Sequence, residues 1–179
     1  MTFFFSSIRR EMISSNGGFM QPQKIVIALP LEEALLDPFY EWGRKFDFSH
    51  VESIHFLHIV KKNVTPLEFG LVESPDNETY KEMEPTLTNF LQEEARKIVP
   101  PDFQGEMHFQ VTQDFHPEEE VIDILKNTKA TLIVVATRGK HGFEGLFHSS
   151  FTDYMVKFAP CDVFVVRPEN RPEESMQSV

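Results

Sequence analysis

The chain has 179 residues, of which 41% are hydrophobic and 25% are charged, a composition that excludes wholesale disorder and fits one domain with a sizeable core. Its formal net charge of −11 at pH 7 argues against nucleic acid as a partner, because an acidic surface repels polyanions. A small anion can still bind, since it needs only a few locally oriented N–H groups.

The single cysteine, Cys161, cannot form an internal disulfide, so nothing indicates an oxidising compartment. No apolar run approaches the roughly 20 residues of a membrane-spanning helix. We therefore expect a cytoplasmic protein that does not engage a membrane. Residues 1–22 are expected to form a flexible extension, residues 23–168 the domain, and residues 169–179 a flexible tail. Met12 and Met20 remain alternative starts.

The first half of the chain alternates short apolar runs with a helical pattern. Residues 24–29 predict a strand buried on both faces, which ends at Pro30. A helix follows, because an apolar stripe with a period near 3.6 runs through Leu35, Leu36, Phe39, Trp42 and Phe46. Residues 53–60 predict a second strand. Residues 61–77 are rich in Asn, Pro and Gly, and we interpret them as a long loop.

The second half continues the alternation. A helix is predicted at least over residues 86–99, and Pro100-Pro101 ends it. Residues 106–112 alternate as a half-buried strand, and a helix starts at His116-Pro117. The pattern closes with a buried strand at 132–136, a glycine-bearing loop at 137–149, a helix at 151–158 and a last strand at 163–166.

This order predicts an α/β fold: an open, five-stranded, mostly parallel sheet with helices on both faces, in three layers. Ligands of such sheets bind outside the carboxyl ends of the strands, at the point where the strand order reverses. That rule directs attention to residues 28–31, residues 59–61 and the loop that starts at Ala136.

The loop after Ala136 contains three of the chain's 8 glycines, Gly139, Gly142 and Gly145. It follows the strongest strand and precedes a helix, whose first N–H groups are unpaired donors. Arg138, Lys140, His141 and His148 add positive charge or polar donors there. These features indicate a phosphate-binding loop, and a connector with solvated basic residues is the alternative. Neither a GK[ST] nor a GxGxxG motif is present.

Three segments together resemble the carboxyl-terminal signature of the universal stress protein family: residues 134–142, the pair Ser149-Ser150, and residues 159–168. Residues 24–29, 55–60 and 117–135 also resemble that family. The resemblance covers about residues 23–168 and identifies the chain as a divergent member. It implies the family's Rossmann-like sandwich, similar to the adenine nucleotide alpha hydrolases.

The chain departs from the family pattern at several positions. Ala136 stands where the first glycine is expected and Ser149 where the third is, whereas Gly139 and Ser150 match. Pro30 replaces the aspartate that meets the nucleoside in ATP-binding members. Such a charged acceptor contributes about 1.5–3 kcal/mol, which corresponds to a roughly tenfold to hundredfold loss of affinity.

The resemblance thus implies either weak ATP binding or no cofactor. A nucleotide would place its phosphates against Gly139 and the Ser149-Ser150 helix start, and its base near Leu29 and Ile59. The complete candidate site is Ala28, Leu29, Pro30, Ile59, Ala136, Arg138, Gly139, Ser149, Ser150, Phe151 and Thr152.

Other chemistry-bearing residues favour structural roles. His55 and His58 are three apart on a strand and point to opposite faces, so they predict structural histidines rather than a metal pair. Cys161 is interpreted as a buried, inert thiol. Ser149 and Ser150 lack a G-x-S-x-G setting and fit helix capping. The carboxylates of residues 118–120 complement a helix dipole. We find no catalytic or metal-binding constellation.

Two functions remain open. The first is a non-enzymatic stress-response or regulatory module that acts as a homodimer, and the second is a slow ATP hydrolase. The missing aspartate favours the first. The last strand is apolar and has no later strand to cover it, so its edge is expected to pair with another strand or to be protected. Universal stress proteins pair this strand across a two-fold axis, so the resemblance implies a homodimer through Val163, Phe164, Val165 and Val166. Coverage by the carboxyl-terminal tail is the alternative.

Overall fold

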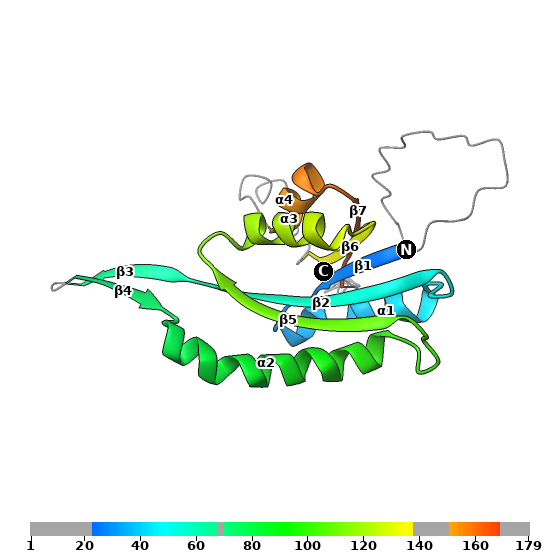
Figure 1. Ribbon diagram of the computed structural model, residues 1–179, viewed down its shortest axis with the longest axis horizontal. Helices are drawn as coiled ribbons and strands as arrows, with labels where there is room; N and C mark the ends of the chain where they lie inside the picture. Colours follow the sequence, from blue (N-terminus) through cyan, green and yellow to red (C-terminus); the bar gives the residue numbers. More distant parts are fainter. Residues whose placement is uncertain (1–22, 68–69, 138–150, 169–179) are drawn as a thin grey trace, which may run out of the picture.

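The computed structural model describes residues 23–67, 70–137 and 151–168 (Figure 1). Its main sheet contains β1 (Gln23–Ala28), β2 (Val51–Lys61), β5 (Glu106–Asp114), β6 (Leu132–Ala136) and β7 (Asp162–Val166). The strand order is β5-β2-β1-β6-β7, and every neighbouring pair is parallel. The predicted α/β fold is therefore confirmed, and β6 lies inside the sheet as its continuous apolar sequence requires.

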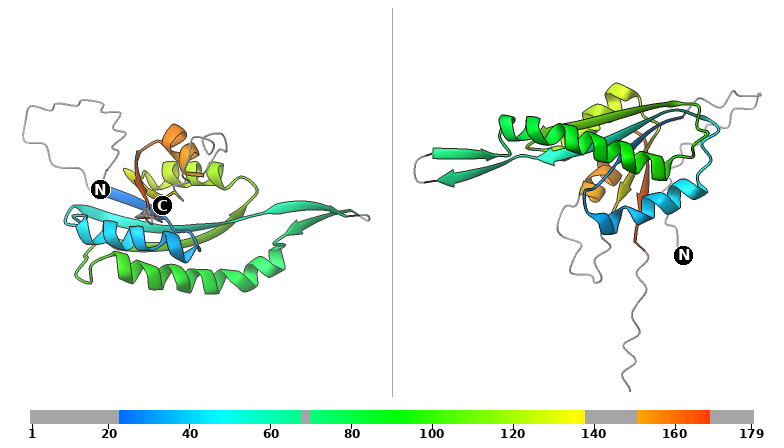
Figure 2. Two further views of the ribbon diagram at one scale, coloured as in Figure 1. Left: turned by 180° about the vertical axis from the view of Figure 1, so that it is seen from behind. Right: turned by 90° about the horizontal axis from the view of Figure 1, so that it is seen from below.

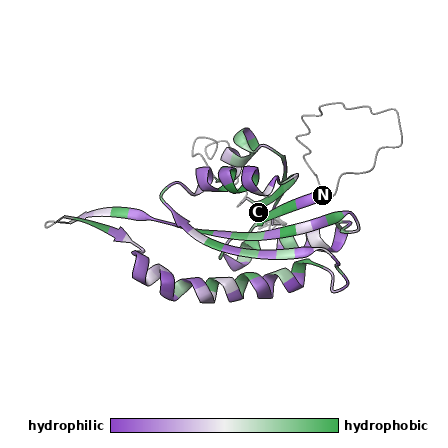
Figure 3. Ribbon diagram, in the orientation of Figure 1, coloured by the Kyte–Doolittle hydropathy of each residue, from purple (hydrophilic) through white to green (hydrophobic). Residues whose placement is uncertain are grey.

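Helices cover both faces of this sheet, as Figures 1 and 2 show. The short 3-10 helix η1 (Glu33–Leu35), α1 (Asp37–Lys45) and α2 (Asn77–Ile98) lie on one face, and α3 (Pro117–Thr128) and α4 (Phe151–Phe158) lie on the other. In Figure 3, α2 and α3 alternate hydrophilic and hydrophobic residues along their length, as amphipathic helices do. None of the described helices is long and apolar enough to cross a membrane.

The sheet separates two hydrophobic clusters. The cluster beneath α1 and α2 includes Phe39, Ile54, Phe56 and Leu91, each fully buried. The cluster beneath α3 and α4 includes Leu57, Val121, Leu125, Ile133 and Met155. The central strands contribute to both, which explains why their sequences are apolar at consecutive positions.

Residues 61–77 do not form the predicted loop. They contain an antiparallel hairpin, β3 (Asn63–Leu67) and β4 (Gly70–Ser74), that projects from the body of the protein (Figures 1 and 2). Pro66 is tolerated because a two-stranded ribbon has only edge strands. The hairpin exposes apolar side chains, with Leu71 74% exposed.

Helix α2 is longer than the predicted residues 86–99, because it begins at Asn77 and includes Pro85. The side chain of Asp76 caps it by accepting a hydrogen bond from the Thr79 N–H at 2.8 Å. The Tyr80 hydroxyl donates to the Val111 carbonyl at 2.9 Å. These contacts stabilise the turns that precede Pro85, which cannot donate a helical hydrogen bond.

Candidate functional site

The candidate site lies at the carboxyl ends of β1 and β6, which are neighbours in the sheet. The chain leaves β1 toward α1 on one face and leaves β6 toward α4 on the other. The strand order reverses at this point, so it is the position where open α/β sheets bind ligands.

Two hydrogen bonds hold the residue that follows β1. The Leu29 N–H donates to the Leu57 carbonyl at 2.9 Å. The Leu29 carbonyl lies 2.8 Å from His58 Nδ1 and can only accept, so Nδ1 carries the proton. Burial lowers the pKa of His58, although this hydrogen bond opposes the effect, and the imidazole is therefore neutral near pH 7. Leu29 fixes the backbone just before Pro30.

Two further hydrogen bonds fix both ends of the glycine loop. The Thr137 N–H donates to the Val166 carbonyl at 3.0 Å. The hydroxyl of Thr152, which is 7% exposed, donates to the Ala136 carbonyl at 2.7 Å. The first turn of α4 is thereby joined directly to the end of β6. The start of a helix, whose first N–H groups have no partners within the helix, thus lies beside the strand end where a ligand is expected.

The structure describes seven of the predicted site residues, and five of them pack into the clusters on the two sides of the sheet. Leu29 and Ala136 pack with the cluster under α1 and α2. Ala28, Ile59 and Phe151 pack with the cluster under α3 and α4. Leu29 and Ile59, which the sequence suggested for one base, therefore belong to opposite faces. Pro30 is half-buried. Arg138, Gly139, Ser149 and Ser150 lie outside the described residues.

Sequence reasoning did not anticipate the links between His58 and Leu29 or between Thr152 and Ala136. A histidine one residue before Ile59, and a threonine at the second position of the helix, are the only signals that the sequence offers for them. Both links depend on the register of strands that are distant in the chain.

A small pocket of about 220 Å³ lies at the same edge of the sheet, and its lining comes from the start of α3 and from α4. Glu118, Glu119 and His116 line it together with Tyr154. Two carboxylates at its wall make this pocket unsuitable for phosphate.

The remaining reactive side chains have structural surroundings. Burial, together with the nearby Asp162, raises the pKa of the Cys161 thiol to about 11, which agrees with the predicted inert cysteine. His55 lies beside His108, with ring centroids 6.0 Å apart, whereas His58 contacts Leu29. Among the described residues, no three His, Cys, Asp or Glu side chains are placed to hold a metal ion.

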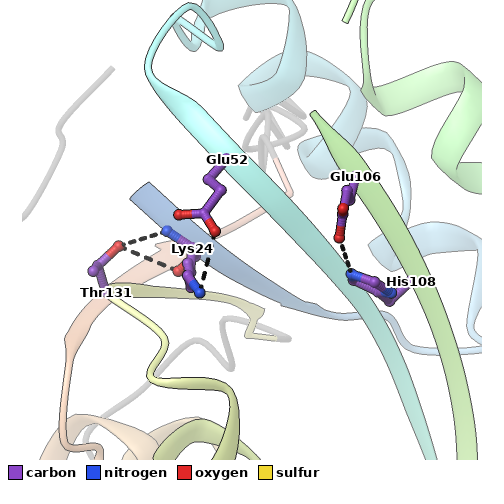
Figure 4. Close-up of polar contacts among 5 residues, drawn as sticks. All are labelled: Lys24, Glu52, Glu106, His108 and Thr131. Atoms are coloured by element: carbon purple, nitrogen blue, oxygen red, sulfur yellow. Dashed lines mark hydrogen bonds and ion pairs between the residues drawn. The ribbon is translucent and has the colours of Figure 1, made fainter. Parts of the chain in front are cut away.

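Figure 4 shows polar contacts that involve the amino ends of the strands. His108 Nε2 lies 3.3 Å from Glu106, and Lys24 Nζ lies 3.3 Å from Glu52. The Thr131 hydroxyl accepts from the Lys24 N–H at 3.1 Å and donates to the Lys24 carbonyl at 3.2 Å. These contacts lie at the opposite end of the strands from the candidate site, and the two that involve Thr131 hold β1 against the residue that precedes β6.

Comparisons with known proteins agree with this architecture. The family model described as the universal stress protein family matches residues 51–167. No curated protein matches the chain at a significant level. The chain resembles the solved structure of hypothetical protein MJ0577 with a TM-score of 0.60 and 16% identity, over 84% of this chain and 99% of that one.

Two other solved structures are similar. One is a universal stress protein in complex with cAMP, with a TM-score of 0.57 and 14% identity over 83% of this chain and 98% of that one. The other is the universal stress protein UspA from Lactobacillus plantarum, with a TM-score of 0.52 and 19% identity over 82% and 99%. At these identities the structures establish a shared fold. Because the family model spans more than half of the sequence, this chain belongs to the universal stress protein family.

Proposed function

We propose that this chain is a non-enzymatic regulatory module that acts as a homodimer and binds an adenine nucleotide weakly at the carboxyl ends of β1 and β6. The observation that carries the proposal is the junction of Thr152 with Ala136, which holds the start of α4 against the strand end. The related universal stress protein in complex with cAMP supports an adenine nucleotide as the ligand class.

The weakness of binding follows from two residues. Pro30 offers no side-chain acceptor where the family's ATP-binding members carry an aspartate, and Ala136 adds a methyl group where they carry glycine. Loss of a charged acceptor costs about 1.5–3 kcal/mol. We expect a dissociation constant for ATP weaker than about 1 μM, which corresponds to −8 kcal/mol.

The non-enzymatic assignment rests on the side chains near the site. His58, the titratable group that contacts Leu29, donates Nδ1–H to that carbonyl and serves to position the backbone. Slow ATP hydrolysis, the alternative function, needs a group that orients or activates water. None of the seven described residues of the candidate site has a carboxylate side chain for that step.

The homodimer would form through the outer edge of β7, on the side away from β6. Within the described sheet, β7 pairs only with β6, and its residues Val163, Phe164 and Val165 are half-buried. Helix α4, which packs beside β7, exposes Val156 and Phe158 at 48% and 58%. An apolar strand edge flanked by exposed apolar side chains favours pairing with a second copy about a two-fold axis.

Light scattering tests the proposed homodimer. The measured mass should be twice the 20.8 kDa chain mass, and a monomer across micromolar concentrations would contradict this assembly.

Titration calorimetry with ATP and with cAMP tests the ligand. The double substitution Pro30→Asp with Ala136→Gly restores the family's acceptor and glycine, so it should tighten ATP binding by about tenfold or more, given 1.5–3 kcal/mol for the acceptor. Pro101→Asp is the matched control, because it adds the same charge to an exposed loop at the opposite end of the sheet. Wild-type affinity tighter than about 1 μM would refute the predicted weakness. Equal, negligible heats for both proteins would refute the nucleotide site.

A further inference from the structure

A second pocket lies at the opposite end of the sheet from the candidate nucleotide site. It has a volume of about 320 Å³ and is lined by the loop between α1 and β2 and the loop between α2 and β5. Three phenylalanines contribute to its lining: Phe46, Phe48 and Phe103. Neighbouring rings meet edge to face, with centroids 5.0 Å apart for Phe46 and Phe48 and 6.0 Å apart for Phe48 and Phe103.

Two carboxylates complete the lining. Asp47 and Asp102 are exposed, and neither has an ion pair with a lysine or arginine among the described residues. Asp47 accepts a hydrogen bond from the Ser49 N–H at 2.9 Å, which lowers the pKa of this carboxyl group. An aromatic lining with two carboxylates suits an apolar side chain together with a cation. Its volume is near the lower limit of about 300 Å³ for ligand pockets, so it fits one or two large side chains.

The first described residue of the chain, Gln23, lies beside this pocket. The Gln23 N–H donates to the His50 carbonyl at 2.9 Å, and Gln23 is paired with Val51, a residue of the pocket lining. The chain therefore enters β1 beside the pocket. Phe19 precedes Gln23 by four residues, and an extended chain of that length spans up to about 14 Å.

The composition of this segment complements the pocket. Residues 1–22 carry Phe19 and Met20 close to β1, and their only lysine or arginine side chains are Arg9 and Arg10. In a chain with a net charge of −11, such a segment has a net positive charge, because Glu11 is its one acidic residue. Covalent attachment also gives it an effective concentration on the order of millimolar at the pocket, which a free ligand must exceed.

We propose that the amino-terminal segment docks into this pocket, with Phe19 against the three phenylalanines and Arg9 and Arg10 facing Asp47 and Asp102. The pocket is then a latch site for the chain's own extension. The latch joins the residues before β1 to the loops that precede β2 and β5. It acts at the end of the sheet remote from the nucleotide site, so it does not depend on the proposed function.

The first test uses the chain's single tryptophan. The Trp42 ring centroid lies 4.6 Å from that of Phe46, in a tilted contact, and 5.8 Å from that of Phe48, edge to face, so Trp42 reports on the pocket lining. In the full-length protein, Phe19→Ser should increase acrylamide quenching of Trp42 and shift its emission to the red. Phe4→Ser, in the same segment but far from β1, is the matched control and should leave both unchanged. Identical spectra for wild type and Phe19→Ser would overturn the proposal.

The second test is disulfide trapping in a Cys161→Ser background. Phe19→Cys is combined with Gln104→Cys, an exposed residue of the pocket lining. The control combines Phe19→Cys with Pro160→Cys, an exposed position before β7 at the same end of the sheet but on the other side of β1. We expect faster cross-linking between positions 19 and 104 than between positions 19 and 160, and equal rates would overturn the proposal.

Charge reversal separates docking from random collision. Asp47→Lys with Asp102→Lys should slow cross-linking between positions 19 and 104, and adding Arg9→Glu with Arg10→Glu should restore it. Circular dichroism of each variant confirms that the fold is retained. A rate that is indifferent to these charges would refute the assigned contact between the arginines and the aspartates.

Discussion

Glu94 is a carboxylate that the fold buries to 4% exposure, and two neighbours compensate for its burial. The Tyr40 hydroxyl donates to Glu94 Oε2, and Lys97 Nζ lies 2.6 Å from Glu94 Oε1. Tyr40 belongs to α1, whereas Glu94 and Lys97 belong to α2. A buried carboxylate without partners is costly, so Glu94 requires these contacts. The contact with Tyr40 thereby joins α2 to α1.

The phenol of Tyr40 makes this junction sensitive to alkali. Burial, and next the hydrogen bond to Glu94, raise the pKa of Tyr40 from 10.0 to about 12. A group whose pKa is higher in the folded state contributes stability that is present below the unfolded pKa and lost as the pH rises through the folded value. The free energy of unfolding should therefore decline between pH 10 and about 12.

Urea unfolding of wild type and Tyr40→Phe over this pH range measures the effect. The stability advantage of wild type should be largest below pH 10 and should shrink as Tyr40 ionises. Glu94→Gln is the companion variant, because it keeps a hydrogen-bond acceptor but removes the charge, and it should show a weaker pH dependence. A wild-type advantage that is constant up to pH 12 would show that the Tyr40 phenol is not coupled to folding.

At the scale of elements, α1 and α2 approach each other through Gly43. A Cβ atom built on Gly43 would lie 3.0 Å from the carbonyl carbon of Ile98 and 3.1 Å from its Cγ2, and closer still to its carbonyl oxygen. Backbone cannot rotate away as a side-chain tip does, so a methyl group here must push the two helices apart.

Gly43→Ala should therefore destabilise the protein. Overpacking costs about 1–3 kcal/mol, and it should outweigh the roughly 1 kcal/mol that alanine contributes through helix propensity. Arg44→Ala, one residue later and exposed, is the control and should change stability by less than about 0.5 kcal/mol. Thermal unfolding decides the sign, and a raised Tm for Gly43→Ala would contradict the close approach.

Elements whose sequence signal is local were predictable, and those stabilised by distant contacts were not. Residues 132–136 and 151–158 have the predicted bounds, because an unbroken β-branched run and a clear apolar stripe define them. The hairpin was missed since Pro66 and Gly70 normally indicate a loop. The sequence predicts α2 at least from residue 86 but not its start at Asn77, because Pro85 interrupts the pattern.

The same distinction applies to the candidate site. Its place at the strand ends followed from the alternation of elements. The hydrogen bond from Thr152 to Ala136 was not predictable, because it requires the register of β6, β7 and α4 to be known. The separation of Leu29 from Ile59 was likewise hidden, since the sequence does not reveal which face each side chain takes at a strand end.

At the scale of the whole molecule, the β3–β4 hairpin is an appendage rather than a part of the core. Asn63 and Ser74 are paired across its base, so the excised ends lie together. Replacing residues 63–74 by Gly-Ser-Gly removes one ion pair, Lys62 with Glu73 at 2.9 Å, and such pairs contribute about 0–1 kcal/mol.

The shortened protein should therefore retain cooperative unfolding, with a loss of less than about 1 kcal/mol. Scrambling residues 63–74 at constant length is the matched control, because it abolishes the strands but keeps the loop length. A loss well above that figure, or a broadened transition, would show that the hairpin is integral to the core.

The central position of β1 has a consequence for how the protein is made. Among the described strands, β1 is synthesised before the others, yet its partner β6 lies more than a hundred residues later, as the 107-residue separation of Lys24 and Thr131 shows. At about 5–20 residues per second, synthesis of that interval takes roughly 5–20 s. During this time β1 can pair with β2 on one side while its other edge stays open and apolar. An unsatisfied strand edge of this kind is a template for aggregation, so the nascent chain, rather than the finished fold, is the state in which this protein most needs a chaperone.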